Sequence, residues 1–199
     1  MEKQTLPAQI EGETVRLKRH SVLDAPLMFA YVDRDRARLR RFLPWVDETK
    51  SVADERAYLD LAIERWVACE SFDFGLFRKS DGTYLGNLGV HTLVWAHNRC
   101  ELGYWMLGEF EGQGFMSEAV ALLERACFTL GMNRVEIRCS SANERSARIP
   151  RRLGYRLDGI LREDMIEDGE YRDTLVFAKL RRDIDANIDL KAPPKPPAR

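Results

Sequence analysis

Three glycines near the middle of the chain, Gly108, Gly112 and Gly114, precede a segment whose apolar residues recur at helical spacing. The recurring residues are Met116, Ala119, Val120, Leu123, Ala126, Cys127 and Leu130. A glycine turn that enters a helix directs several unpaired N–H groups at one point, with the positive end of the helix dipole behind them. We therefore expect an anion site at this turn, suited to a pyrophosphate group.

Two common phosphate-binding patterns do not fit the turn. A Walker loop requires a lysine directly after its last glycine, and none follows Gly114. A dinucleotide-binding fingerprint requires a glycine at position 117, which is Ser117, and an N-terminal strand–helix–strand setting. Backbone donors alone must then hold the phosphates. The alternative is that the glycines serve only the geometry of a strand-to-helix turn.

The segment Glu111-Gly-Gln-Gly-Phe-Met-Ser-Glu-Ala119 resembles the acetyl-CoA loop of the GNAT acyltransferases, whose pattern is Gln/Arg-x-x-Gly-x-Gly/Ala. Further segments are similar to the RimJ/RimL branch of that family: Leu43-Pro-Trp45, Glu101-Leu-Gly-Tyr-Trp-Met-Leu107, Asn143-Glu-Arg-Ser146 and Leu153-Gly-Tyr155. The resemblance covers roughly residues 13 to 181. The chain departs from the pattern at Glu111, which puts a negative charge near the phosphate site, and at Met116.

The resemblance implies that acetyl-CoA, the co-substrate, lies where two parallel strands, 100–106 and 134–139, part. Its pantetheine arm is expected along the strand edge, its diphosphate on the N–H groups from Gln113 to Ser117, and Asn143 on the other side of the arm. The implied cofactor-binding residues are Trp105, Met106, Leu107, Gln113, Gly114, Phe115, Met116, Ser117, Asn143 and Ser146. A backbone N–H near Met106 is expected to polarise the thioester carbonyl.

An amine is expected to attack the thioester directly, without a covalent enzyme intermediate. Ser146 matches the position that RimL-type enzymes place beside the sulfur, so the resemblance implies that it is the general acid; the alternative is a first-turn helix serine bonded to backbone. Glu101 and Glu163 are the candidate bases. Glu163 is expected to replace a Glu that related sequences carry where this chain has Met165, because the two positions share a strand face. Glu101 is alternatively an acceptor anchor or a solvated residue.

Trp45 lies in a loop that, in the resembling family, helps to wall the acceptor site; the alternative is a core position. A protein α-amine has a pKa of about 7.7–8.0 and a lysine about 10.4, so at pH 7 roughly a tenth of an α-amine is neutral. The weak base candidates therefore favour an α-amine, and the resemblance implies the N-terminus of a ribosomal protein. Two alternatives stay open: a small amine such as an amino acid, polyamine or aminoglycoside, and a CoA-binding regulatory module without strong catalysis.

The composition predicts a single domain over residues 1–185, followed by a proline-rich basic tail over 186–199. A net charge of −1 argues against nucleic-acid binding, and no apolar run is long enough to cross a membrane. The N-terminus has no apolar signal region, and the four cysteines lack metal-ligand spacing, so we expect reduced thiols, no metal and a cytoplasmic protein. RimL-like proteins are often dimers, which makes a homodimer the family expectation.

The pattern of elements indicates an α+β fold. The expected strands span 14–18, 72–78, 83–94, 99–106, 134–139, 156–166 and 171–180, and the expected helices span about 24–34, 51–70, 115–130 and 143–153. The GNAT resemblance implies a mixed, mostly antiparallel central sheet splayed between two parallel strands, with about four flanking helices. In the helix over 51–70 we expect one stripe of Ala57, Leu61, Glu64 and Ala68, with the apolar face broadened by Tyr58, Ile63, Trp66 and Val67. Pro150 lies inside the last helix and removes the hydrogen bond back to Ser146. Five arginines between Asp33 and Arg41 are expected on a solvated face.

Overall fold

The computed structural model describes residues 2–184, and the proline-rich tail over 186–199 lies outside the described residues. The strands are β1 (Gln9–Glu11), β2 (Val15–Arg19), β3 (Phe72–Arg78), β4 (Tyr84–Val94), β5 (Arg99–Met106), β6 (Arg134–Ser140), β7 (Arg156–Glu167) and β8 (Glu170–Leu180). The α-helices are α1 (Ala25–Arg34), α2 (Arg36–Leu39), α3 (Val52–Val67), α4 (Phe115–Thr129) and α5 (Glu144–Arg152). Short 3₁₀ turns include η2 (Pro44–Asp47). The expectation of about four helices missed α2, a single turn of four residues.

The eight strands form one sheet in the order β1-β2-β3-β4-β5-β6-β8-β7. Every neighbouring pair is antiparallel except β5 and β6. This parallel pair is joined through α4, as a parallel connection requires a long crossover. The α+β class and the mixed, mostly antiparallel sheet are therefore confirmed.

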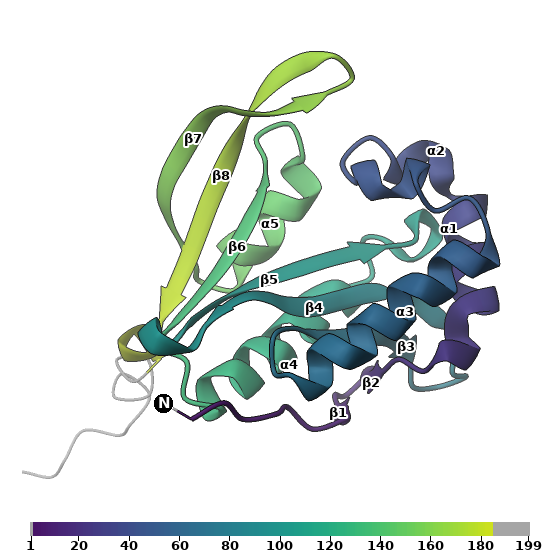
Figure 1. Ribbon diagram of the computed structural model, residues 1–199. Helices are drawn as coiled ribbons and strands as arrows, with labels where there is room; N and C mark the ends of the chain where they lie inside the picture. The colour runs from purple at the N-terminus through teal and green to yellow at the C-terminus, as the bar shows by residue number, and fades with distance from the viewer. Residues whose placement is uncertain (1, 185–199) are drawn as a thin grey trace, which may run out of the picture.

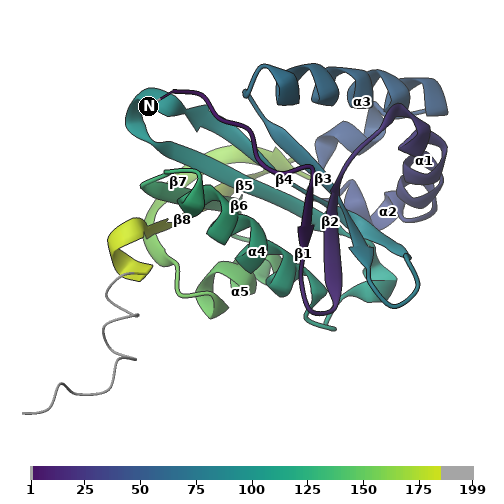
Figure 2. The ribbon, with the colours of Figure 1, turned by 90° about the horizontal axis from the view of Figure 1, so that it is seen from below.

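Helices cover the sheet on both faces. Tyr84, on β4, packs with residues of α1 and α3, whereas the next residue, Leu85, belongs to the larger core that contains the buried side of α4. Consecutive strand residues point to opposite faces, so α1 and α3 lie on one face and α4 on the other. Figure 2 shows this arrangement, with α1 and α3 on one side of the strands and α4 and α5 on the other.

The two parallel strands separate soon after they begin to pair. β5 and β6 are in register only from Arg99 to Glu101 on one strand and from Arg134 to Glu136 on the other. Beyond these residues β5 continues against β4, and β6 continues against β8. Figure 1 shows the resulting fork, with β6, α5 and the β7–β8 hairpin on one arm and the end of β5 on the other. The predicted parting of the strands is confirmed.

The buried stripe of α3 differs from the one expected. The structure buries Glu55, Leu59, Ala62 and Trp66, which follow one another at steps of four, three and four residues. Leu61, on the expected stripe, is 42% exposed. The predicted stripe was wrong because it was shifted by two residues along the chain, which places it on another side of the helix, whereas Trp66, expected to broaden the apolar face, is buried. As a result, the side of α3 that faces the sheet includes a carboxylate, Glu55.

Candidate active site

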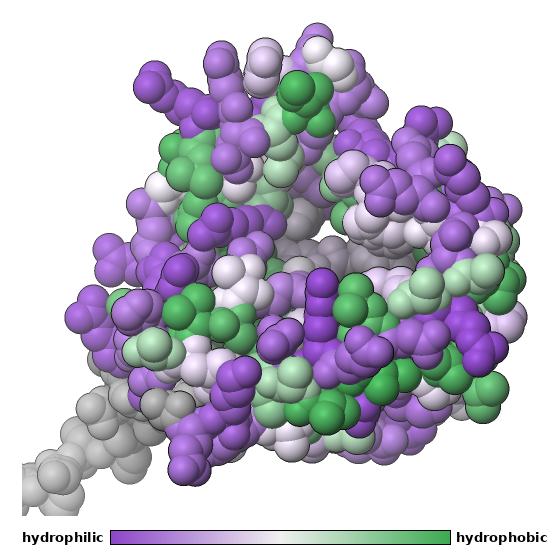
Figure 3. Space-filling model, in the orientation of Figure 1, coloured by the Kyte–Doolittle hydropathy of each residue, from purple (hydrophilic) through white to green (hydrophobic). Residues whose placement is uncertain are grey.

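A cavity of about 700 Å³ fills the fork between β5 and β6. Its walls come from α2, the end of β5, the first turn of α4, the end of β6 and the start of α5. Figure 3 shows the face hollowed between the β7–β8 arm and the helices α1 and α2. Of the predicted cofactor residues, this first cavity is lined by Trp105, Met106, Met116, Asn143 and Ser146.

The glycine turn leads directly into α4. Gly112 and Gly114 have φ angles of 77° and 88°, in the left-handed region that glycine occupies without strain. Gly114 is the N-cap residue and supplies no side chain, so the N–H groups of the first helical turn, Phe115 to Ser117, have no partner within the helix. Their amides and the helix dipole provide donors for an anion beside the cavity.

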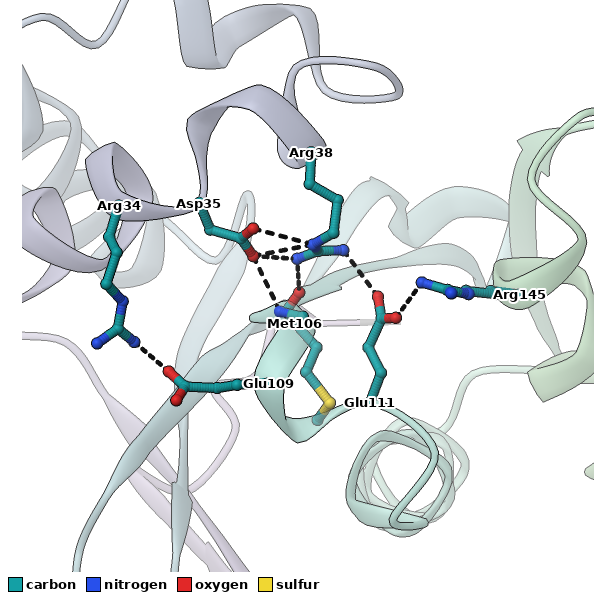
Figure 4. Close-up of polar contacts among 8 residues, drawn as sticks. Arg34, Asp35, Arg38, Met106, Glu109, Glu111 and Arg145 are labelled. Atoms are coloured by element: carbon teal, nitrogen blue, oxygen red, sulfur yellow. Dashed lines mark hydrogen bonds and ion pairs between the residues drawn. The ribbon is translucent and has the colours of Figure 1, made fainter.

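An ion-pair cluster bridges the mouth of the first cavity (Figure 4). Arg38, from α2, donates from Nη1 to Glu111 at 2.7 Å and from Nη2 to the Met106 carbonyl at 2.5 Å. Arg145, from α5, donates to the other oxygen of the same carboxylate. Glu111, the departure from the family pattern, is therefore balanced by two guanidinium groups.

Asp35 anchors Arg38 in this position. Its carboxylate accepts from Arg38 Nε at 2.9 Å and from the Gly108 N–H at 2.9 Å. Burial raises the pKa of Asp35, but these hydrogen bonds outweigh burial and hold the pKa below its ordinary value. A Cβ at Gly108 would lie 2.7 Å from Arg38 Nε, so the close approach requires a glycine. Arg38, expected on a solvated face, is instead part of the cavity wall.

Ser146 lies in the first turn of α5, beside Tyr104 of β5. Its amide donates to the Asn143 side chain at 3.1 Å, and its hydroxyl donates to the Tyr104 hydroxyl at 3.4 Å. Because Pro150 has no N–H, the Ser146 carbonyl lacks its usual helical donor, and the Tyr104 hydroxyl donates to it at 3.1 Å. Burial raises the pKa of Tyr104, so this phenol stays protonated at neutral pH. The serine hydroxyl thus faces the cavity and a second side chain.

A second cavity, of about 600 Å³, lies on the α3 face of the sheet. It meets the first cavity at Leu43, Tyr104 and Trp105, which line both. Trp45, from η2, lines the second cavity, and its ring centroid is 5.9 Å from that of Trp105. The residue expected to wall an acceptor site therefore lies beside a cavity that adjoins the fork.

The two predicted bases lie outside the linings of both cavities. Glu101 precedes Gly103 by two residues on the same face of β5, and its carboxylate lies 3.5 Å from Arg138 Nε. Burial raises the pKa of Glu101, and Arg138 only partly opposes this shift. Glu163 is exposed, with a φ of 51°, inside an irregular stretch of β7 between Leu161 and Met165. That irregularity breaks the strand alternation from which a shared face with Met165 was predicted.

Five other predicted cofactor residues lie beside the first cavity without lining it. Leu107 is 1% exposed, packs in the core below α1 and α3, and donates its N–H to the Leu85 carbonyl at 2.9 Å. The remaining four form the turn and the start of α4: Gln113, Gly114, Phe115 and Ser117. The Ser117 hydroxyl accepts from Arg152 Nη1 at 3.3 Å, which adds a cation next to the unpaired amides.

Sequence reasoning missed Arg38, Tyr104 and Glu55. Arg38 follows Asp35 at the i, i+3 spacing of helical ion pairs, a signal hidden among four other arginines. Pro150, four residues after Ser146, indicated that the Ser146 carbonyl lacks its helical hydrogen-bond donor. The donor that replaces it, the Tyr104 hydroxyl, comes from a strand distant in sequence and could not be read from this spacing. Glu55 stands at helical spacing from Leu59, Ala62 and Trp66, and this spacing is the signal that could have identified it as a buried acid.

Comparison with known proteins decides the family. The family model described as "Acetyltransferase (GNAT) domain" matches residues 14–156 of this chain. The chain belongs to the GNAT acetyltransferase family. This GNAT enzyme is 29% identical over 178 residues to the putative ribosomal N-acetyltransferase YdaF of Bacillus subtilis (strain 168), covering 87% of this chain and 93% of that protein. It is 31% identical over 170 residues to the uncharacterized N-acetyltransferase YoaA of the same organism, covering 85% and 94%.

A solved structure supports the fold of this GNAT enzyme. The RimL ribosomal L7/L12 α-N-protein acetyltransferase in complex with coenzyme A superposes with a TM-score of 0.81 at 22% identity, covering 89% of this chain and 98% of that one. The family match makes the chain a GNAT-family N-acetyltransferase, and a protein of the same fold has been solved in complex with coenzyme A.

Three further features concern metal sites, membrane spans and thiols. Within residues 2–184, no group of three or more His, Cys, Asp or Glu side chains is arranged to hold a metal ion. None of the helices in the described part of the chain has the length and apolar character needed to span a bilayer. All four cysteines are free thiols, and burial raises the pKa of Cys139, which lines the first cavity.

Proposed function

We propose that the protein transfers acetyl from acetyl-CoA to the N-terminal α-amine of a protein, most directly a ribosomal protein. The observation that carries the proposal is the fork: β5 and β6 pair over three residues and then part around a cavity of about 700 Å³. The unpaired amides at the start of α4 adjoin it. Relatives named as ribosomal N-acetyltransferases support the choice of acceptor.

In this proposal the residues of the first cavity hold acetyl-CoA. Backbone amides from Gln113 to Ser117 bind its diphosphate, with Arg152 close by at Ser117. The free edge of β5 at Trp105 and Met106 offers backbone groups to the pantetheine arm in the manner of an added strand. Asn143 uses its side-chain oxygen to cap α5, which leaves its amide NH₂ facing the cavity as a donor.

The proposed chemistry is direct attack of a neutral amine on the thioester carbon. The carbon–sulfur bond breaks, and Ser146 delivers a proton to the departing thiolate. Tyr104 holds the Ser146 carbonyl at 3.1 Å and receives the serine hydroxyl at 3.4 Å, which fixes the proton donor at the junction of the two cavities. A backbone N–H near Met106 polarises the thioester carbonyl.

The remaining site residues concern the base and the contacts with the acceptor. Glu101 on β5 and Glu163 on β7 were predicted as bases, but both lie outside the cavity linings, so we keep Glu101 only as a proposed acceptor anchor. Trp45 is proposed to wall the acceptor cavity, where its ring lies beside Trp105. We assign the protein to the cytoplasm, where ribosomal proteins are made.

A homodimer is proposed as the working form. Apolar side chains remain exposed on the β7–β8 hairpin, among them Ile160 at 50%, Ile166 at 65% and Tyr171 at 65%. A second copy of the chain covers such a patch in this proposal. Light scattering on the purified protein measures the mass directly, and a monomer at micromolar concentration contradicts it.

A small amine is the second candidate acceptor. The observation that favours it is the second cavity, of about 600 Å³, which has carboxylates in its lining. Such a cavity accommodates a compact amine as readily as the first residues of a peptide.

The experiment that tests the proposal uses a peptide with one free N-terminus and one lysine. After incubation with acetyl-CoA, intact-mass and fragment-mass analysis shows which amine carries the added acetyl group. We expect the label on the N-terminus, with an N-terminally blocked peptide unlabelled. Label on lysine alone overturns the acceptor assignment. Binding of acetyl-CoA without thiol release, across a panel of peptides and small amines, overturns the enzymatic proposal.

A further inference from the structure

The second cavity has a one-sided charge. Four carboxylate side chains line it, those of Glu48, Asp54, Glu55 and Asp73, together with His91. No lysine or arginine of residues 2–184 belongs to this lining. The first cavity, by contrast, includes Arg38, Arg41, Arg138 and Arg145 in its lining. The cavity that adjoins the reaction point from the α3 side is therefore built for a positive charge.

Glu55 gives this cavity a buried carboxyl group with an unsatisfied oxygen. The residue is 3% exposed, and its Oε2 atom is buried without a hydrogen-bond partner among residues 2–184. A buried carboxyl that lacks a partner is costly as an anion. Burial raises the pKa of Glu55 to about 7, and the ring of His20 only partly opposes this shift. A bound cation, or a proton received from one, relieves the cost.

The floor of the cavity is bare because two glycines lie opposite each other. Gly89 of β4 pairs with Gly103 of β5, and both line the cavity. A Cβ at Gly89 would lie 2.5 Å from Asp73 Oδ1, and a Cβ at Gly103 would lie 3.2 Å from the His91 ring. The missing side chains let Asp73 and His91 reach over the sheet, where Asp73 Oδ1 and His91 Nε2 lie 3.6 Å apart.

We propose that this cavity binds the acceptor as its ammonium ion and that Glu55 takes the ammonium proton, so that acceptors with a negative charge next to the amine are rejected. The inference rests on the proposed acetyl transfer and names the substrate class of the same site. The nitrogen–hydrogen bond of the ammonium breaks and the proton passes to the Glu55 carboxylate. The neutral amine then attacks the thioester, and the second proton lost by nitrogen leaves with the thiol through Ser146.

The assignment discriminates between amines. An α-ammonium group has a pKa of about 7.7–8.0, close to the value of about 7 for Glu55, so its proton passes to the carboxylate readily. A lysine, with a pKa of about 10.4, holds its proton much more tightly than the same carboxylate does. The buried acid therefore serves an α-amine and is poorly matched to a lysine.

The first experiment compares Glu55→Gln with Glu64→Gln, which makes the same change at an exposed position of α3. Acetyl-CoA affinity and steady-state kinetics with an N-terminal peptide are measured for both. We expect kcat/KM for the peptide to fall about 100-fold in Glu55→Gln, the scale of a lost general base, with the Kd for acetyl-CoA unchanged. An unchanged kcat/KM in a folded Glu55→Gln protein overturns the inference while leaving acetyl transfer intact.

The second experiment varies the acceptor. Peptides that differ only at the first residue, Ala, Lys or Asp, are compared in the wild-type protein. We expect the Asp peptide to react at least 10-fold less well than the other two, because four carboxylates face it. Equal rates for all three overturn the proposed role of the cavity. Absence of transfer to every amine, with acetyl-CoA bound, instead refutes the proposed function and is distinguishable from both results.

A third variant tests the role of the cavity's shape independently of the Glu55 carboxyl. Gly103→Ala places a methyl group 3.2 Å from the His91 ring and narrows the floor. We expect a several-fold higher KM for the peptide and an unchanged Kd for acetyl-CoA. A higher Kd for acetyl-CoA with an unchanged peptide KM contradicts the division of the two cavities between the substrates.

Discussion

The two cavities lie against one strand and have opposite chemistry. The first cavity has four arginines and three glutamates in its lining, whereas the second has four carboxylates and no arginine or lysine of the described residues. Tyr104 and Trp105 line both. Adjacent residues of a strand point to opposite faces, so one short segment of β5 gives access to both cavities.

This difference separates two tasks that a direct acyl transfer must combine. A polyanionic nucleotide and a cationic amine have to approach one another without either charge disturbing the other's binding. The two charges lie in separate cavities, which meet near the end of β5, at Tyr104 and Trp105, where the fork is open. In the first cavity Glu111 pairs with Arg38 and Arg145, whereas in the second the buried Oε2 atom of Glu55 has no hydrogen-bond partner among residues 2–184.

The largest expected effect concerns the stability cost of the acidic cavity. The pKa of Glu55 is raised from 4.5 to about 7, so the unpartnered anion costs up to about 3 kcal/mol above pH 7. Below pH 4.5 both folded and unfolded chains hold the proton and no cost arises. The free energy of unfolding therefore falls as pH rises from 4.5 to 7, and Glu55→Gln removes this fall.

Urea unfolding at pH 5 and pH 8 measures the effect. We expect Glu55→Gln to be more stable than the wild type at pH 8, with a much smaller difference at pH 5, and Glu64→Gln to match the wild type at both. A Glu55→Gln protein that is less stable at pH 8 would show that the carboxylate has a partner and that the second cavity is not short of positive charge.

A smaller effect is expected at the glycine turn of the first cavity. Gly114→Ala places a side chain at a φ of 88°, which costs about 1–2 kcal/mol and turns the amides away from their common point. We expect the Kd for acetyl-CoA to rise about 10-fold. The control is Gly159→Ala, because a Cβ at either glycine meets nothing within 4 Å but Gly159 has no left-handed φ. Equal Kd values for the two variants count against the amide site.

The hydrogen bond from the Tyr104 hydroxyl to the Ser146 carbonyl is expected to contribute about 1 kcal/mol to the free energy of unfolding. Tyr104→Phe removes the donor to the Ser146 carbonyl and lowers the free energy of unfolding by about that amount. Pro150→Ala restores a backbone N–H for the same carbonyl. In a double-mutant cycle, Tyr104→Phe is therefore expected to cost clearly less in the Pro150→Ala background. Additive effects contradict the exchange of donors.

The smallest expected effect concerns Glu111. Glu111→Gln removes one negative charge beside the diphosphate, while Asp35 still holds Arg38 in place. Exposed charge pairs have small energies, so we expect acetyl-CoA to bind about twofold to fivefold more tightly at low salt. Glu109→Gln, on the same loop but outside the cavity lining, is the control. Weaker binding by Glu111→Gln indicates that the carboxylate orients the arginines for the nucleotide.

Local sequence patterns were sufficient for most of the fold. Glycine turns, capping residues and apolar periodicity located the strands and helices to within a few residues, as in Phe72–Arg78 and Arg99–Met106, because these features act over one or two turns of chain. The fork was predicted only through the family resemblance. No local pattern states that β5 and β6 pair over three residues and then diverge.

The site was less predictable because its key contacts are long-range. Arg38 and Glu111 are 73 residues apart, and Tyr104 and Ser146 are 42 apart. Glu55 was missed for a different reason: the predicted stripe was shifted by two residues along α3, which placed it on another side of the helix. Glu163 was assigned from strand alternation, which fails at the irregularity in β7. Exceptions of this kind lie at the second cavity and on the hairpin, where charge and function override packing rules.

The most direct test of the two-cavity account is a crystal structure of the protein with acetyl-CoA and an unreactive acceptor peptide. We predict the diphosphate against the amides of residues 113–117, the thioester at Tyr104 and Trp105, and the peptide N-terminus in the cavity that contains Glu55. A structure in which the nucleotide occupies the acidic cavity, or in which the peptide amine approaches from the arginine-lined side, contradicts the account.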